Sequence, residues 1–174
     1  MNSIFITSEL DGDIAARIRA LQERWDPKLA HELPPHVTLI GSSGAGPIAP
    51  DTSIEDLRAA ILPIARQTPP LDLTFGPPVR FIGREIVVLP LNPHGPLRAL
   101  HEALKASGLR YEPARWPFTP HCTLNYHATL TPESLDALLS YREPEPWRLH
   151  TLLVYHTRDH APPTRLLEVR LTGR

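Results

Sequence analysis

The pentapeptide PHVTL at residues 35–39 occurs again as PHCTL at residues 120–124. This repeated motif decides the fold, because its two copies lie about half of the 174-residue chain apart. Successive side chains of a β-strand point to opposite faces, so each copy is predicted to present its histidine and its threonine together. Two such strands facing each other would surround one small space with two imidazoles and two hydroxyls. The four side chains concerned are His36, Thr38, His121 and Thr123.

The full motif is far more specific than the tripeptide His-x-Thr inside it. The chain contains nine histidines, and a third tripeptide, His127-Ala128-Thr129, occurs without the preceding proline. Chance would supply the motif with its proline and leucine roughly 0.01 times per chain, and two copies about 10⁻⁴ times. We therefore interpret residues 127–129 as a chance occurrence and the two full copies as functional.

Composition limits the classes of protein that fit this chain. Its 174 residues are 41% hydrophobic, which is enough for a core in one domain or in two fused lobes. The net charge of −1 argues against a protein that coats long nucleic acid by bulk electrostatics, so an anionic ligand would have to be held by a local cluster. The one cysteine, Cys122, has no internal disulfide partner and is expected to be buried. Without a signal-peptide pattern or a run of membrane-spanning length, we expect a cytoplasmic protein with no membrane partner.

The predicted elements follow the same order in both halves of the chain. A strand and a helix precede each motif strand, and a further helix and strand follow it. This order indicates an internal duplication within one domain over residues 1–174, whose interdependent halves span roughly 1–83 and 84–174. Interspersed strands and helices without sustained parallel runs favour an α+β fold with antiparallel sheets. Besides the second motif, strands are expected at residues 4–7, 36–40, 71–75, 79–82, 85–91, 149–155 and 166–171.

Helices are expected where apolar residues recur at helical spacing after a capping signal. One helix should begin at Thr52, whose hydroxyl would form a capping box with Glu55, and Pro63 should kink or end it. The other helices are expected to begin near Asp11, at Pro96 and at Thr131.

Paired histidines and threonines suit acid–base chemistry on a phosphodiester. Opening a cyclic phosphodiester needs a base that takes a proton from water and an acid that protonates the departing oxygen. Histidine can serve either role, since its reference pKa is ~6.5. Threonine hydroxyls can donate hydrogen bonds to the oxygens where charge develops. Such chemistry requires no metal and no cofactor.

A metal site is the sharpest alternative to this chemistry, because the histidines could be ligands. Neither copy of the motif has a second close ligand, however. The chain also contains no Cys-x-x-Cys and no His-Glu-x-x-His.

Four residues outside the motifs are candidates for holding the rest of a substrate. Arg115, Trp116 and Phe118 directly precede the second copy, and Tyr155 lies late in a predicted strand. An arginine can bind a second phosphate, and an aromatic ring can stack on a base. The alternative for each is a structural role, with the arginine solvated and the rings packed in the core.

With these motifs the sequence resembles the two-histidine phosphoesterase superfamily, in particular its bacterial 2′-5′ RNA ligase-like, RNA 2′,3′-cyclic phosphodiesterase branch. PHVTL and PHCTL are similar to the duplicated His-x-Thr signature of that family, and residues 118–121 are similar to the usual lead-in of its second copy. The resemblance extends over nearly the whole chain. It implies a bilobal fold in which antiparallel sheets face a central cleft, with helices on the outside.

The resemblance also implies a reaction, namely the opening of a 2′,3′-cyclic phosphate on an RNA end or a nucleotide to a 2′-phosphomonoester, without metal or cofactor. Ligation of 2′-5′ ends would be a reverse-type activity. By the same resemblance His36 is the general acid, His121 is the general base, and Thr38 and Thr123 bind phosphate. The sequence itself leaves the two histidine roles open, because the copies are nearly equivalent.

Two further questions stay open at the level of sequence. Residues 31–34 lack the usual basic or aromatic lead-in to the first copy, so both RNA ends and small nucleotides remain candidate partners. The main rival is a non-catalytic module that binds RNA ends or nucleotides on the same scaffold. In either case we expect a monomer.

Overall fold

The two motif strands lie at the centre of one antiparallel sheet. The structure is a computed structural model that describes residues 2–159 and 161–174. Within these residues, seven strands form a sheet in the order β4-β5-β6-β2-β1-β8-β9, and β3 pairs with β7 in a separate ribbon. The strands are β1 (Ser3–Glu9), β2 (His36–Ile40), β3 (Leu71–Leu73), β4 (Val79–Arg80), β5 (Val87–Pro90), β6 (His121–Asn125), β7 (Trp147–Leu149), β8 (Thr151–Arg158) and β9 (Ala161–Arg170).

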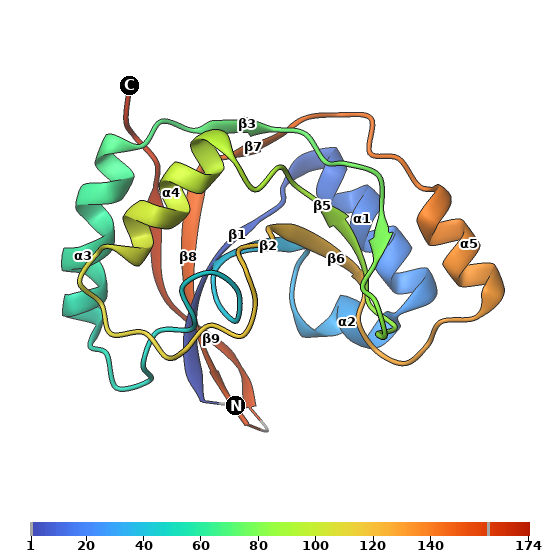
Figure 1. The fold of residues 1–174 in the computed structure, drawn as a ribbon, viewed down its shortest axis with the longest axis horizontal. Helices are drawn as coiled ribbons and strands as arrows, with labels where there is room; N and C mark the ends of the chain where they lie inside the picture. The colour runs from blue at the N-terminus through green and yellow to red at the C-terminus, as the bar shows by residue number, and fades with distance from the viewer. Residues whose placement is uncertain (1, 160) are drawn as a thin grey trace.

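Helices cover the strands from outside in two groups. Figure 1 shows α3 and α4 on one side of the central strands, and α1, α2 and α5 on the other. Among the described residues, no helix is both long enough and apolar enough to span a membrane. The helices are α1 (Gly12–Trp25), α2 (Pro27–Glu32), α3 (Ile54–Gln67), α4 (Gly95–Lys105) and α5 (Pro132–Ser140).

Each half of the chain covers the motif strand of the other half. Helix α1 follows β1 in sequence but packs on β6, and α4 follows β5 but packs on β2. Neither motif strand is therefore buried by its own half alone. This exchange supports our proposal that residues 1–174 form one domain whose halves cannot be separated.

The expected fold class is confirmed, since the strands pair antiparallel and the helices lie outside them. The structure adds that β4, β5 and β6 in one lobe and β2, β1, β8 and β9 in the other form one continuous sheet. They join at the pairing of β2 with β6, where the Cα partners are Val37 and Cys122. The sheet buries one face of both strands, because Val37 and Cys122 are each 0% exposed.

Several predicted boundaries were wrong for local reasons. The N-cap of α3 is Ser53 and not Thr52, because the Ser53 hydroxyl accepts the N–H of Asp56 while the Thr52 hydroxyl donates to the carbonyl of Ala49. Of the two outcomes expected at Pro63, a kink or an end of the helix, the end does not occur, since the helix continues to Gln67 with Leu57, Ile61 and Ala65 buried on the face that packs against β9.

The strand expected at residues 149–155 is in fact divided. Its first part belongs to β7, which pairs with β3, and the remainder is β8, which pairs with β1 and β9. A short helix, α2, also follows α1 directly, with Pro27 at its first position. Proline ends one helix here and begins the next, because its fixed φ suits the first helical turn.

Two long loops from opposite halves are bound together by their backbones. The N–H of Gly44 donates to the carbonyl of Trp116, and the N–H of Arg115 donates to the carbonyl of Ser42. Gly46 is required at the crossing, since its φ is +87° and a Cβ there would lie 1.8 Å from the carbonyl oxygen of Glu112. This crossing fixes the backbone that carries Arg115 and Trp116.

We predict that Gly46→Ala lowers the free energy of unfolding by about 2–4 kcal/mol, because the methyl group clashes with backbone at a strained φ. Gly83→Ala is the matched control, since Gly83 also has a positive φ (+70°) but an added Cβ there would meet no atom within 4 Å. This control should cost about 1 kcal/mol. Urea unfolding measures both, and equal losses would contradict a close approach at Gly46.

Candidate active site

The two motif histidines project from neighbouring strands onto one face of the sheet. Val37 and Cys122 are Cα partners in an antiparallel pair, so His36 lies beside Thr123 and Thr38 lies beside His121. The two histidines are diagonal neighbours in this pairing, and diagonal neighbours are about 7–8 Å apart. All four side chains are half-buried, and we call the surface that they share the motif face.

Both motif strands carry a β-bulge at the same place, directly after His-x-Thr. In β2 the register passes from Thr7–Thr38 to Ile6–Ile40 and leaves Leu39 without a partner. In β6 it passes from Val88–Thr123 to Val87–Asn125 and leaves Leu124 without one. A bulge increases the local bend and twist of a strand and re-aims its side chains. The duplication therefore extends to the backbone irregularity that ends each motif.

Each histidine is oriented by a hydrogen bond to the carbonyl two residues before it. The Nδ1 atom of His36 lies 2.8 Å from the oxygen of Pro34, and the Nδ1 atom of His121 lies 2.7 Å from the oxygen of Thr119. A carbonyl only accepts, so Nδ1 carries the proton and donates it in both rings. The Nε2 atoms have no hydrogen-bond partner within residues 2–159 and 161–174, so they are the atoms available for proton transfer.

Burial lowers the pKa of both rings. For His36 the hydrogen bond to Pro34 and the charge of Glu9 act in the opposite direction and raise the pKa. For His121 the bond to Thr119 raises the pKa, while a charge on His36 lowers it further. Protonating one ring therefore disfavours protonating the other, which favours the state with a single proton on the pair.

The threonine hydroxyls complete the motif face. In the described part of the chain, neither the Thr38 nor the Thr123 hydroxyl has a hydrogen-bond partner, so both can donate to a bound anion. Gly41 leaves room for the Thr38 side chain, because a Cβ at position 41 would lie 2.7 Å from the Thr38 methyl group. Two imidazoles and two free hydroxyls thus converge on one site.

Polar side chains from behind hold the backbones of the motif strands. Gln22 on α1 donates to the carbonyl of Thr123 at 2.8 Å, and His101 on α4 has Nδ1 2.8 Å from the carbonyl of Leu39. Asp26 is fully buried and accepts the N–H groups of Tyr126 and His127, both at 2.8 Å. These contacts connect the two halves of the chain directly behind the motif strands.

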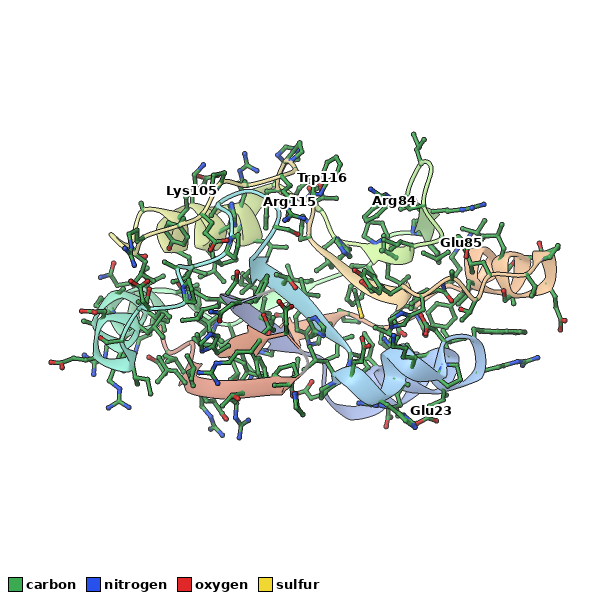
Figure 2. The ribbon with its side chains drawn as sticks, turned by 90° about the horizontal axis from the view of Figure 1, so that it is seen from below. Glu23, Arg84, Glu85, Lys105, Arg115 and Trp116 are labelled. Carbon is green, nitrogen blue, oxygen red and sulfur yellow. The ribbon has the colours of Figure 1, made fainter. Side chains whose placement is uncertain are left out.

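Arg115 and Trp116 are exposed on the loop that precedes β6. Figure 2 shows both on the loop that rises on the same side of the molecule as the Arg84–Glu85 turn, away from Glu23. The indole of Trp116 is 61% exposed although its backbone is bound to Ser43 and Gly44. An exposed aromatic ring on a backbone held by hydrogen bonds is suited to stacking on a base.

The side chains of Phe118 and Tyr155 contact other residues of the protein and are not free to contact a ligand in the same way. Phe118 is 6% exposed and stacks on the ring of His101 at 3.8 Å between centroids, so its ring is part of the core. The hydroxyl of Tyr155 donates to Glu9 at 2.6 Å. The stacking role expected for Phe118 therefore does not fit its surroundings.

A recess of about 450 Å³ adjoins the motif face. Its lining includes Phe5, Ser42, Arg115 and Tyr126, but none of the four motif residues. Phe5 links it to the site, because this ring and Thr38 both lie against Gly41. A larger hollow of about 530 Å³ lies beside α3 and contains none of the predicted site residues.

The sequence analysis missed two neighbours of the histidines. Phe81, just after β4, meets His121 edge to face at 5.3 Å between centroids. Glu9 is the Cα partner of His36 across the β1–β2 pair. Neither residue belongs to a sequence motif, and only the register of the strands reveals them. Among the described residues, no group of three or more His, Cys, Asp or Glu is placed to hold a metal ion.

Comparison with known families assigns this architecture. The family model described as the 2′-5′ RNA ligase superfamily matches residues 10–161. The chain belongs to the 2′-5′ RNA ligase superfamily. This superfamily is the group of two-histidine phosphoesterases that the paired motifs resemble, so the expected family is confirmed. No match was found among curated proteins.

Solved structures share the fold of this superfamily member over its whole length. The protein TT0787 of Thermus thermophilus superimposes with a TM-score of 0.73 at 20% identity, covering 99% of each chain. E. coli LigT complexed with NADP+ gives a TM-score of 0.60 at 21% identity, covering 99% of this chain and 98% of that one. LigT complexed with 3′-AMP gives 0.60 at 19% identity with the same coverage. At these identities the likeness shows the fold alone.

We predict that Cys122, in the middle of the second motif, is chemically inert in the folded protein. Burial raises the pKa of its thiol to about 12, and the side chain is 0% exposed, so no reactive thiolate forms at pH 8. A colorimetric disulfide reagent should titrate no thiol in the native protein and one thiol in guanidinium. Rapid native reaction would show that the β2–β6 pairing opens.

Proposed function

We propose that this protein is a metal-independent phosphodiesterase that opens 2′,3′-cyclic phosphates, on RNA ends or on nucleotides, to 2′-phosphomonoesters. The observation that carries the proposal is the pair of Nδ1-anchored histidines on adjacent strands, each beside the threonine of the other copy. Membership of the two-histidine phosphoesterases supports the reaction class. Ligation of 2′-5′ ends would use the same site in the reverse direction.

In the proposed reaction the two rings act from opposite ends of an in-line displacement. The neutral Nε2 of His121 takes a proton from water as the water oxygen bonds to phosphorus. The bond from phosphorus to O3′ breaks, and the protonated Nε2 of His36 gives its proton to O3′. The product carries phosphate on O2′, and a proton has passed from one ring to the other. Solvent exchange restores the starting state.

The threonines have a separate role in this scheme. Charge accumulates on the two non-bridging oxygens as the water attacks, and each oxygen can accept a hydrogen bond from Thr38 or Thr123. Because both hydroxyls are free within the described chain, they need not break an existing bond to donate. Donors that are already oriented lower the barrier without reorganisation.

Arg115, Trp116 and the adjoining recess are proposed to bind the nucleoside part of the substrate. Trp116 offers a stacking surface, and Arg115 offers a charge to a neighbouring phosphate. The related E. coli protein has been crystallised with NADP+, 3′-AMP and ATP, which supports a nucleotide as ligand. Tyr155 is left out of direct binding in this proposal, since its hydroxyl is occupied by Glu9.

We predict that His36→Ala and His121→Ala each lower kcat by about 10²–10⁴-fold, since each removes one proton-transfer group. The assay follows hydrolysis of a 2′,3′-cyclic nucleotide in excess chelator and locates the product phosphate by NMR. His94→Ala is the control, because His94 is exposed at the start of α4 and outside the site. Wild-type rates in both site variants would exclude the mechanism.

Calorimetry and elemental analysis, run beside this assay, separate the rival functions. A non-catalytic binding module would bind the nucleotide in calorimetry without any product. A metal hydrolase would carry stoichiometric zinc in elemental analysis and would lose its activity in chelator.

We predict that Trp116→Ala raises KM by about 5–100-fold with little change in kcat, because stacking binds substrate and transition state equally. Trp116→Phe should retain most of the affinity, since a smaller aromatic ring still stacks. Both variants are measured by steady-state kinetics on two substrates. One is a dinucleotide that ends in a 2′,3′-cyclic phosphate, and the other is a 2′,3′-cyclic mononucleotide. An unchanged KM on both substrates would remove Trp116 from the binding site.

A further inference from the structure

The two copies of the motif are nearly identical, yet their neighbours across the sheet differ. The Cα partner of His36 on β1 is Glu9, whereas the Cα partner of His121 on β5 is Pro90. Directly opposed residues of an antiparallel pair share a face, with Cβ atoms about 4.5–5.5 Å apart. A carboxylate therefore stands beside one imidazole, and an uncharged ring stands beside the other.

Tyr155 holds the Glu9 carboxylate on the motif face. It is the Cα partner of Phe5, and its hydroxyl donates to the Glu9 Oε1 atom at 2.6 Å. The bond spans Thr7, which lies between Phe5 and Glu9 on the same face of β1 and is only 5% exposed. Burial and the neighbouring Glu9 raise the pKa of Tyr155 to about 12, so the phenol keeps the proton that it donates.

The charged and titratable groups around His36 and Tyr155 come from strands β1, β6 and β9. Glu9 on β1 and His121 on β6 flank His36, and their charges have opposite effects on its protonation. Arg165 and Glu168 on β9 act on Tyr155 with opposite signs. Among the described residues, no Glu9 carboxylate oxygen lies within 4 Å of a His36 ring nitrogen, so the two do not form an ion pair. Glu9 therefore acts on the His36 ring by long-range electrostatic attraction.

From this asymmetry we propose that Glu9, oriented by Tyr155, is the positioning residue that assigns the two catalytic roles by keeping the single proton of the pair on His36. The inference rests on the proposed function, in which the protonated ring is the general acid. A fixed negative charge stabilises the imidazolium nearer to it. The proton that His121 later takes from water returns through solvent to the same resting arrangement, so each cycle starts with the acid at His36.

The test is the substitution Glu9→Gln, which removes the charge but leaves an amide oxygen to accept the Tyr155 hydroxyl. Imidazole NMR titration without substrate should show the pKa of His36 falling by about 0.5–1 unit, as expected for loss of a nearby charge at an effective dielectric constant between water and protein. The pKa of His121 should change less. Glu9→Asp keeps the charge and should largely restore the wild-type titration.

Glu23→Gln is the matched control, because Glu23 is an exposed carboxylate on α1 on the far side of the molecule from Arg115 and Trp116 (Figure 2). It should leave both titrations unchanged. Tyr155→Phe keeps the charge of Glu9 but frees its carboxylate, so the pKa of His36 should move in the same direction by a smaller amount.

The pH profile gives a second readout that a merely structural role would not move. The acid must be protonated, so its pKa sets the alkaline limb of kcat/KM, and that limb should shift to lower pH in Glu9→Gln by the same amount as in the NMR titration. An equal pKa for His36 in Glu9→Gln and wild type, or an equal fall at both histidines, overturns the proposal. If the wild-type protein hydrolyses the substrate but the pKa of His36 does not change in Glu9→Gln, only this inference is contradicted. If that pKa changes but the wild-type protein does not hydrolyse the substrate, only the proposed function is contradicted.

Discussion

The candidate active site depends on one narrow contact, the antiparallel pairing of Val37 on β2 with Cys122 on β6. The pairs β1–β8 and β4–β5 also join strands from different halves of the chain, but only the β2–β6 pair within the described sheet joins the two motif strands and so sets the spacing of the two histidines. Because the contact is short, it needs support from elsewhere. Gln22, His101 and Asp26 supply it from behind, each by binding a backbone group of a motif strand or of the segment that follows it.

This arrangement supports our proposal that the two halves form one interlocked domain and not two independent units. A histidine and a threonine on one strand make half of a site. Antiparallel pairing of two nearly identical motif strands brings the histidine of each beside the threonine of the other. Helix α1 of the first half packs on β6 of the second half, and helix α4 of the second half packs on β2 of the first half. Each half therefore contributes to the burial of the other half's motif strand. Symmetry supplies matched reagents, and small departures such as Glu9 opposite His36 and Pro90 opposite His121 can make them unequal.

The sequence predicted what depends on local pattern. Alternation along PHVTL and PHCTL put the histidines and threonines on one face and Leu39 and Leu124 in the core, where both are buried. It could not choose between Ser53 and Thr52 as N-cap, because adjacent hydroxyls satisfy the same local pattern and a loop contact to Ala49 decides. It could not separate Trp116 from Phe118 either. Both are aromatic rings before the motif, and only the packing of His101 against Phe118 distinguishes the buried ring from the exposed one. The partner of His36 depends on strand register, which is a tertiary property.

The central claim is that both imidazoles expose Nε2 to one shared site while Nδ1 donates to a carbonyl. Long-range ¹⁵N–¹H NMR of the folded protein reports the protonation of each ring nitrogen directly. The account predicts Nδ1–H for His36 and His121 in their neutral forms, and a simultaneous perturbation of both Nε2 signals when a 2′-phosphorylated nucleotide is added. An Nε2–H tautomer in either ring, or a response confined to one histidine, would contradict it.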